Sequence, residues 1–327
     1  MLQKMKVYAL ALVGLMSLFL AGCSDYVMFD PKGPIAETQR DLIMYSIWFM
    51  LFIMVVVYVI FAFVLVKYRD RKGYNAKDHD PHMHGSLKLE IIWTVIPLLI
   101  VIALAVPNGK ALYEFVNPPE SSAGKEPIVI HATAVDWKWI FSYEEENIET
   151  VNYVNVPEDT PILFKVTAAD SMASFWVPQI GGQIYGMPGM VNNLYLQADE
   201  PGEYEGRNSN FTGRQMTHQT FRFVALEEEE YAQWVKETQE TAPELTEVQY
   251  EQLILPGTVE EMTFSNTHLD IVDHGVDSGV YAMNIREKYG VTIDPHGAES
   301  HEESHDEGHD AHEDHADHSD EEHAHHE

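Results

Sequence analysis

The chain opens with three long apolar runs, which we place at Val7–Leu20, Leu42–Val66 and Ile91–Asn108. The second run carries no charge and exceeds the roughly 20 residues that a helix needs to cross a bilayer. We expect a first membrane helix that starts just after Arg40-Asp41 and stops at Lys67. A second helix should run from about Ile91 to Asn108. The pattern predicts a transmembrane hairpin over residues 42–110.

The first apolar run is typical of a signal peptide. Lys4 and Lys6 precede it, and Leu20-Ala21-Gly22-Cys23 follows it. That tetrapeptide resembles the bacterial lipoprotein box, in which the cysteine is lipidated and becomes the mature N-terminus. We predict that residues 1–22 are removed and that Cys23 carries lipid as an extra tether. An ordinary secretory signal and an uncleaved anchor remain alternatives.

Basic side chains determine the predicted orientation of the hairpin. They gather in the connecting loop, residues 67–89, which the positive-inside rule places in the cytoplasm. Residues 23–41 and everything after Lys110 then lie outside. The chain is predicted to be a multi-pass protein of a bacterial cell membrane, with its large domain on the extracytoplasmic face.

Beyond the hairpin the pattern changes to short alternating stretches bounded by Gly, Pro and Asn. Between residues 126 and 226 we expect about seven to nine short strands, which favours an all-β barrel or sandwich. The expected strands are Ile128–Val135, Lys138–Tyr143, Ile162–Val166, Ser174–Val177, Asn193–Leu196, Gly202–Gly206 and Gln219–Val224.

Two further segments follow the β domain. Residues 227–295 form a C-terminal extension that begins with a helical stretch broken at Ala242-Pro243, and we expect its Tyr231 and Trp234 to pack on the barrel or on a partner. Residues 296–327 are rich in Asp, Glu and His and cannot bury enough apolar surface to fold. Such a tail can bind metal loosely, and a plain solvated tail is the alternative.

The net charge and the cysteine count exclude some partners and some kinds of site. The formal net charge is -32, from 52 acidic and 20 basic residues, so we expect no nucleic-acid partner. Cys23 is the single cysteine, which excludes an intramolecular disulfide and any site with two thiolates.

The segment Tyr204–Phe223 looks like the metal-binding loop of a cupredoxin domain, a glycine-bounded turn between two strands. Copper loops use thiolate, imidazole and thioether ligands. Where a dinuclear copper loop would place two cysteines four residues apart, this chain has Asn208 and Thr212. We therefore expect a cupredoxin-like domain that lacks its copper ligands.

With the lipobox, hairpin and β domain in this order, the chain resembles subunit II of the haem-copper terminal oxidases, in its copper-less quinol-oxidase branch. The resemblance covers Cys23 to about Lys288. It is carried by the segment Tyr204–Phe223 and by Asp30–Ile35, Leu89–Pro97, Trp137–Trp139, Ser174–Pro178 and Tyr185–Gly189.

The copper-binding branch of the family supplies its ligands from known loop positions and one upstream His. In this chain those positions are occupied by Ala173, Asn208, Asn210, Thr212, Met216 and Gln219. Met216 could offer a thioether where a His belongs, and Asn210 replaces the acidic residue that the family uses for magnesium. The resemblance therefore implies no metal and no other cofactor in this chain.

The resemblance also implies the route of electrons. Without copper there is no acceptor for cytochrome c, so the donor is a membrane quinol, menaquinol or ubiquinol, bound mainly by subunit I. The haems and copper belong to that subunit, and further small membrane subunits are expected partners. Electrons reduce oxygen to water while protons cross the membrane.

Glu90 is the candidate functional residue, because an ionisable group at the end of a membrane helix is costly and usually functional. The resemblance assigns it the entrance of a proton-uptake path into subunit I. The alternative is a helix-start glutamate that favours the N-terminal dipole. Trp137 and Trp139, two apart on a predicted strand, should point to one face. We expect them to serve packing or subunit docking.

Two other classes of protein remain to be weighed. A subunit II of a cytochrome c oxidase would require two loop cysteines, which this chain lacks. A membrane-anchored metal-binding lipoprotein would act through the His-rich tail. Co-purification with a haem-bearing membrane subunit would distinguish the oxidase from the lipoprotein.

Overall fold

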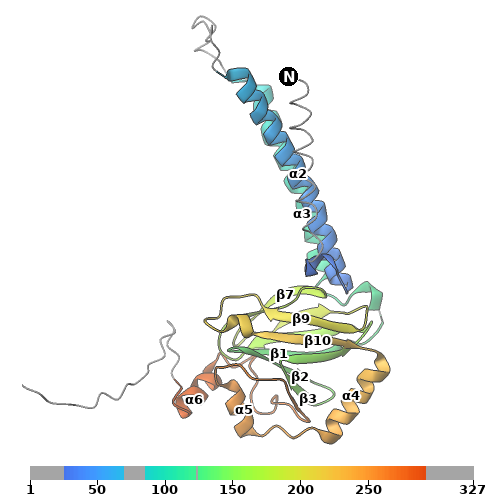
Figure 1. Ribbon diagram of the computed structural model, residues 1–327, viewed down its shortest axis with the longest axis vertical. Coiled ribbons are helices and arrows are strands. Elements are labelled where there is room, and N and C mark those ends of the chain that lie inside the picture. Colours follow the sequence, from blue (N-terminus) through green and yellow to red (C-terminus); the bar gives the residue numbers. More distant parts are fainter. Residues whose placement is uncertain (1–25, 70–84, 123, 292–327) are drawn as a thin grey trace, which may run out of the picture. The chain divides into compact units, whose positions relative to one another are not determined.

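The computed structural model describes residues 26–69, 85–122 and 124–291. Figure 1 shows the two long helices α2 and α3 and a β sandwich with helices α4, α5 and α6 after it. The helices are α2 (Pro34–Tyr68), α3 (Leu87–Glu114), α4 (Glu228–Thr241), α5 (Glu247–Ile254) and α6 (Val280–Lys288). The strands are β1 (Ile128–Val135), β2 (Lys138–Tyr143), β3 (Ile148–Val151), β4 (Tyr153–Pro157), β5 (Ile162–Ala168), β6 (Ala173–Val177), β7 (Gly181–Gly186), β8 (Asn192–Leu196), β9 (Gly202–Asn208), β10 (Thr220–Leu226) and β11 (Met262–Phe264).

Helices α2 and α3 are the two helices in the described part of the chain that are long and apolar enough to cross a membrane. No residue of their apolar windows is buried in the isolated chain, as expected where lipid or a partner covers them. The two helices lie side by side (Figure 1), and the Tyr45 hydroxyl of α2 donates to the Ala103 carbonyl of α3 at 3.4 Å.

Both helices extend beyond their apolar runs. The first begins at Pro34 and not after Asp41, so the predicted start was wrong. Proline suits the first helical position because it has no N–H to leave unpaired. The polar first turns of α2 are stabilised by ion pairs of Arg40. Its guanidinium pairs with Glu37 at 3.1 Å and with Asp41 at 2.8 Å. Hydropathy marks the lipid-covered length of a helix, and the helix itself can continue into water.

The β domain is a sandwich of two sheets, as the sequence predicted. One sheet has the order β11-β3-β2-β1-β5-β8 and the other β4-β10-β9-β6-β7. Alternate side chains of both sheets form a common core, in which Trp139 contacts Phe175 and Phe221 with ring centroids 5.2 and 5.8 Å apart. We refer below to the first as sheet A and the second as sheet B.

The start of α2 joins the edge of sheet B through the segment Asp30–Ile35. The Lys32 amide donates to the Gln179 carbonyl at 2.7 Å, and the Ala36 amide donates to the Ile180 carbonyl at 3.2 Å. A side chain on Gly33 would place its Cβ 2.2 Å from the Gln197 carbonyl oxygen. Glycine is therefore required here by the close approach of two backbones.

The C-terminal extension packs on the sandwich at two places. In α4, Trp234 lies against Tyr143 with ring centroids 5.4 Å apart, and against Tyr231 at 5.7 Å. The expected packing of Tyr231 and Trp234 on the β domain is thereby confirmed. Further on, α5 begins with a capping box between Thr246 and Gln249. A second apolar cluster, including Leu253 and Phe264, covers the outer face of sheet A.

Candidate functional site

The loop predicted from the cupredoxin pattern connects β9 to β10, two antiparallel neighbours in sheet B. Strand β9 ends at Asn208, a short 3-10 turn spans Met216–His218, and β10 begins at Thr220. Strand β6 lies on the other side of β9. The fold therefore brings the loop beside the start of β6, where Ala173 lies, so the candidate ligand positions gather in one region.

The side chain of Asn208 uses its whole hydrogen-bonding capacity in bonds within the loop and to the neighbouring strand β6. Its Nδ2 donates to Thr212 Oγ1 at 3.0 Å and to Gln219 Oε1 at 2.8 Å. Its Oδ1 accepts the backbone amides of Ser174 at 2.8 Å and Asn210 at 2.9 Å. A carboxamide has two N–H donors and two oxygen lone pairs, and all four are occupied here.

Gln219 completes this amide network, which we define as Asn208, Thr212 and Gln219. Gln219 is 1% exposed, and its Nε2 donates to the carbonyls of Val135 at 3.2 Å and Lys138 at 3.3 Å. Its Oε1 accepts from Asn208 and from Thr212 Oγ1, the latter at 3.3 Å. The side chain thus ties the loop to the β1–β2 turn, and its oxygen already has two donors.

The remaining candidate positions do not provide a set of copper ligands either. Ala173 is buried and offers only a methyl group. Asn210 donates its Nδ2 to the Met172 carbonyl at 2.8 Å. Met216 is half-buried in the 3-10 turn and would be a lone thioether. Within residues 26–69, 85–122 and 124–291, no group of three or more His, Cys, Asp or Glu side chains is arranged to hold a metal ion.

The two tryptophans do not share a face, so that prediction was wrong. Trp139 lies in β2 and is fully buried between the sheets. Trp137 lies in the turn before β2, where strand alternation does not apply. Its half-buried indole donates to the Thr212 carbonyl at 2.8 Å. Trp139 is a core residue, whereas Trp137 holds the loop against the β1–β2 turn.

A buried charged cluster lies beside this turn. The Lys138 ammonium donates to the Leu255 carbonyl at 2.7 Å, and burial lowers the pKa of Lys138 to about 8. The Arg286 guanidinium of α6 pairs with Asp170, whose pKa is raised to about 6 by burial and by the neighbouring Asp136. These groups connect the turn to the extension.

The other sequence candidates lie apart from the loop. Glu90 occupies the exposed first turn of α3, and its carbonyl accepts from Thr94 Oγ1 at 2.9 Å. Cys23 and the His-rich tail fall outside the described residues.

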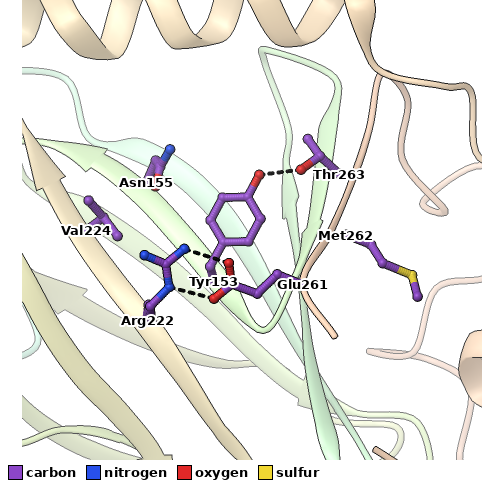
Figure 2. Close-up of a pocket in the computed structure, with 7 residues that line it drawn as sticks. All are labelled: Tyr153, Asn155, Arg222, Val224, Glu261, Met262 and Thr263. Carbon is purple, nitrogen blue, oxygen red and sulfur yellow. Dashed lines mark hydrogen bonds and ion pairs between the residues drawn. The ribbon is translucent and has the colours of Figure 1, made fainter. Parts of the chain in front are cut away.

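A pocket of about 490 Å³ opens elsewhere in the domain, between β4, β10 and β11 (Figure 2). Arg222 lines this pocket. Its guanidinium forms a bidentate pair with Glu261 at 2.5 Å and donates to Glu203 at 3.1 Å. With both charges neutralising it, Arg222 is not free to bind an anion. The pocket is lined by Tyr153, Asn155, Arg222, Val224, Glu261, Met262 and Thr263.

The sequence analysis also did not predict a buried pair formed by Glu149 and His268. Glu149 and His268 are fully buried and lie 2.6 Å apart between Glu149 Oε2 and His268 Nδ1. The available signal was a charged residue between Ile148 and Thr150-Val151, inside a short β-branched run. The partner histidine lies far along the chain, and no local pattern indicates it.

Two apolar helices followed by a cupredoxin-like sandwich define a class of membrane-anchored oxidase subunits, and comparisons with known proteins agree. The family model "Cytochrome C oxidase subunit II, transmembrane domain" matches residues 23–110. "Cytochrome C oxidase subunit II, periplasmic domain" matches residues 128–226.

Curated relatives give a closer match. The chain is 56% identical over 278 residues to "Quinol oxidase subunit 2" of Bacillus spizizenii, covering 85% of this chain and 86% of the relative. It is 43% identical over 261 residues to "Probable quinol oxidase subunit 2" of Staphylococcus haemolyticus, covering 80% and 68%. The crystal structure of the periplasmic domain of cytochrome oxidase subunit II from Bradyrhizobium japonicum is 26% identical over 34% of this chain and 93% of its own, with a TM-score of 0.33.

The chain therefore belongs to the cytochrome c oxidase subunit II family, as a quinol oxidase subunit 2. It is a membrane protein with two transmembrane helices, an extracytoplasmic sandwich domain and C-terminal helices. The class of protein, the fold and the place in an oxidoreductase complex agree with the expectations from sequence.

Proposed function

We propose that this chain is the copper-free subunit II of a proton-pumping oxidase that oxidises membrane quinol and reduces oxygen to water. The single observation that carries the proposal is the amide network at the ligand positions. Asn208 and Gln219 are buried, and their oxygens already accept protein hydrogen bonds. To bind a cation they would have to give up these bonds, and they would offer only hard oxygen ligands that suit copper poorly.

The electron route follows from that loop. With no redox centre in the outer domain, electrons enter from a lipid-soluble donor that reaches the haem-bearing subunit I through the bilayer. The relatives are described as quinol oxidase subunits, which supports this donor. Cytochrome c has no acceptor in this chain. The haems, the copper and most of the quinol site belong to subunit I, and small membrane subunits complete the complex.

Glu90 is proposed to be the proton-uptake entrance. It lies in the first turn of α3, exposed in the isolated chain, so its carboxylate is available to a channel in subunit I. The basic loop, residues 67–89, precedes it and places this end of the helix on the cytoplasmic side, where protons are taken up. A purely structural role at the helix N-terminus is the competing explanation.

Membrane attachment is proposed to have two components. Helices α2 and α3 span the bacterial cell membrane, and Cys23 adds a lipid anchor on the outer face. A lipid chain contributes roughly 0.8 kcal/mol per buried methylene, so it supplements the helices and does not replace them.

Purification of the complex from membranes tests these proposals together. We expect haem to co-purify with this chain, quinol to support oxygen consumption, and reduced cytochrome c to give none. Electron paramagnetic resonance should lack a mixed-valence dinuclear copper signal, and the intact mass of the chain should match lipidated Cys23. Oxidase activity with cytochrome c, or a dinuclear copper signal from this chain, would overturn the copper-free assignment. A free, haem-less monomer carrying metal would instead support the metal-binding lipoprotein.

A further inference from the structure

The outer face of sheet A carries a row of polar residues that the proposed function does not use. Strand register aligns Lys165 with His131, His131 with Ser142, and Ser142 with Glu149. The row runs from the half-buried Lys165 to the fully buried Glu149. Its buried end lies beneath residues 245–288, which we call the covering segment.

Glu149 is bound to the covering segment through one oxygen. Its Oε2 accepts the His268 amide at 2.9 Å, lies 2.6 Å from His268 Nδ1, and accepts the Ser142 hydroxyl at 2.9 Å. Its Oε1 is buried with no partner. A buried carboxylate with one oxygen unpaired depends strongly on the donors at the other. Removing the covering segment would therefore break two of the three bonds to Glu149.

His274 lies beside His268 in the covering segment, with ring centroids 5.7 Å apart. Its Nε2 lies 2.6 Å from the Tyr250 hydroxyl, and its Nδ1 is buried without a hydrogen bond. The Tyr250 ring stacks on His268 with centroids 4.4 Å apart. A second proton on His274 would sit on the buried Nδ1, from which the Asp277 carboxylate oxygen Oδ2 lies 3.9 Å away, beyond hydrogen-bond distance.

The charged and titratable groups around His274 come from each element packed on it. They are Tyr250 of α5, Tyr281 of α6, and His268 and Asp277 of the intervening loops, with Glu149 of β3 bound to His268. His268 disfavours a second positive charge, and the carboxylate of Glu149 is already engaged by His268. The site thus stabilises a neutral His274.

We propose that Glu149, Tyr250, His268 and His274 form an acid-sensitive latch, which holds the covering segment on sheet A at neutral pH and releases it when the outer compartment becomes acidic. The latch is argued from the contacts of the outer domain alone. Its use as a response to protons that accumulate on its own side of the membrane rests on the proposed function.

The sign of the effect follows from His274. Burial, and then the neighbouring His268, lower the pKa of His274 to about 3 in the closed state. In the released segment its pKa returns to about 6.5. The contribution of neutral His274 to the stability of the closed segment is therefore complete above pH ~6.5. It is lost as the pH falls from there towards 3. His274 alone makes release about 30-fold more favourable at pH 5 than at pH 8.

Hydrogen exchange of the purified complex tests the latch. Protection factors, corrected for the intrinsic pH dependence of exchange, are measured for residues 245–288 at pH 8 and pH 5. We expect protection to fall about 30-fold in this segment, and to change little in β9 and β10 of sheet B. Equal protection at both pH values would overturn the proposal.

His274→Gln removes the titration and keeps an amide that can bond to the Tyr250 hydroxyl. We expect this variant to lose most of the pH dependence. The control is His218→Gln, the same substitution at an exposed histidine, which should retain the full 30-fold response. If His274→Gln still shows that response, the latch is excluded. If this variant does not assemble, the wild-type comparison at two pH values still decides.

Discussion

Gln219 shows how a single buried side chain can tie a loop to a neighbouring turn through hydrogen bonds. Its amide bonds to Asn208 and Thr212 within the loop and to the carbonyls of Val135 and Lys138 in the β1–β2 turn. These contacts join the loop to the β1–β2 turn, whereas the upstream ligand position of the family, Ala173, lies at the start of β6. The loop keeps its shape because an uncharged group bridges it.

Gln219→Leu should destabilise the outer domain by about 2–4 kcal/mol. The change leaves buried carbonyls and the Asn208 amide without partners, and each buried unpaired group costs about 1–3 kcal/mol. Chemical denaturation of the purified chain measures the loss. The control is Gln183→Leu, since Gln183 is exposed and bonds to Ser174 and Ser209. The control should lose less than about 1 kcal/mol of stability. An equally small loss for Gln219→Leu would contradict a stabilising role of the Gln219 hydrogen bonds.

Glu90→Gln should slow a proton-uptake phase of oxygen reduction by roughly tenfold, equivalent to about 1.4 kcal/mol in the barrier. Assembly and haem content should not change, because Glu90 makes no side-chain hydrogen bond or ion pair in the described structure. Time-resolved absorbance with a pH dye measures the phase. Glu114→Gln at the other end of α3 is the matched control. Unchanged kinetics in Glu90→Gln would leave only the interaction with the helix N-terminal dipole.

Among the elements, the strands with alternating side chains were predictable and the irregular ones were not. Strands β1 and β2 have the predicted bounds, and β5, β6 and β8–β10 differ by a few residues at their ends. The sequence analysis missed β3, β4, β7 and the short β11 of the extension. Strands β3 and β4 are fully buried on both faces, so they show no alternation, and β7 begins with two glycines.

The contact between the start of α2 and the edge of sheet B can be tested by substituting Gly33. Gly33→Ala should destabilise the outer domain by about 3 kcal/mol, because the new methyl group would overlap the Gln197 carbonyl. Circular dichroism melting of the purified chain measures it. Gly109→Ala in α3 is the control, since no heavy atom lies within 4 Å of its added Cβ, and it should leave the melt unchanged. Equal melts for both variants would refute the close-packing argument.

At the scale of the whole molecule, the features that follow from local residue patterns were predictable. Those that depend on contacts between distant segments were not. The hairpin, the sandwich and the absence of cysteines from the loop can be inferred from residue order alone. The amide network and the Glu149–His268 pair depend on which side chains meet after folding, across separations of 11 and 119 residues. Trp137 was misplaced for the same reason, because its position depends on a turn and a tertiary bond to Thr212.

The amide network also bears on how the protein matures. A loop with two thiolates must be kept reduced on the oxidising side of a membrane until its metal arrives. Asn208, Thr212 and Gln219 cannot be oxidised to a disulfide, and their bonds form as the chain folds. We therefore expect the outer domain of this subunit to reach its final form without a copper donor or a thiol reductant. Copper supply would then limit only the partner subunit.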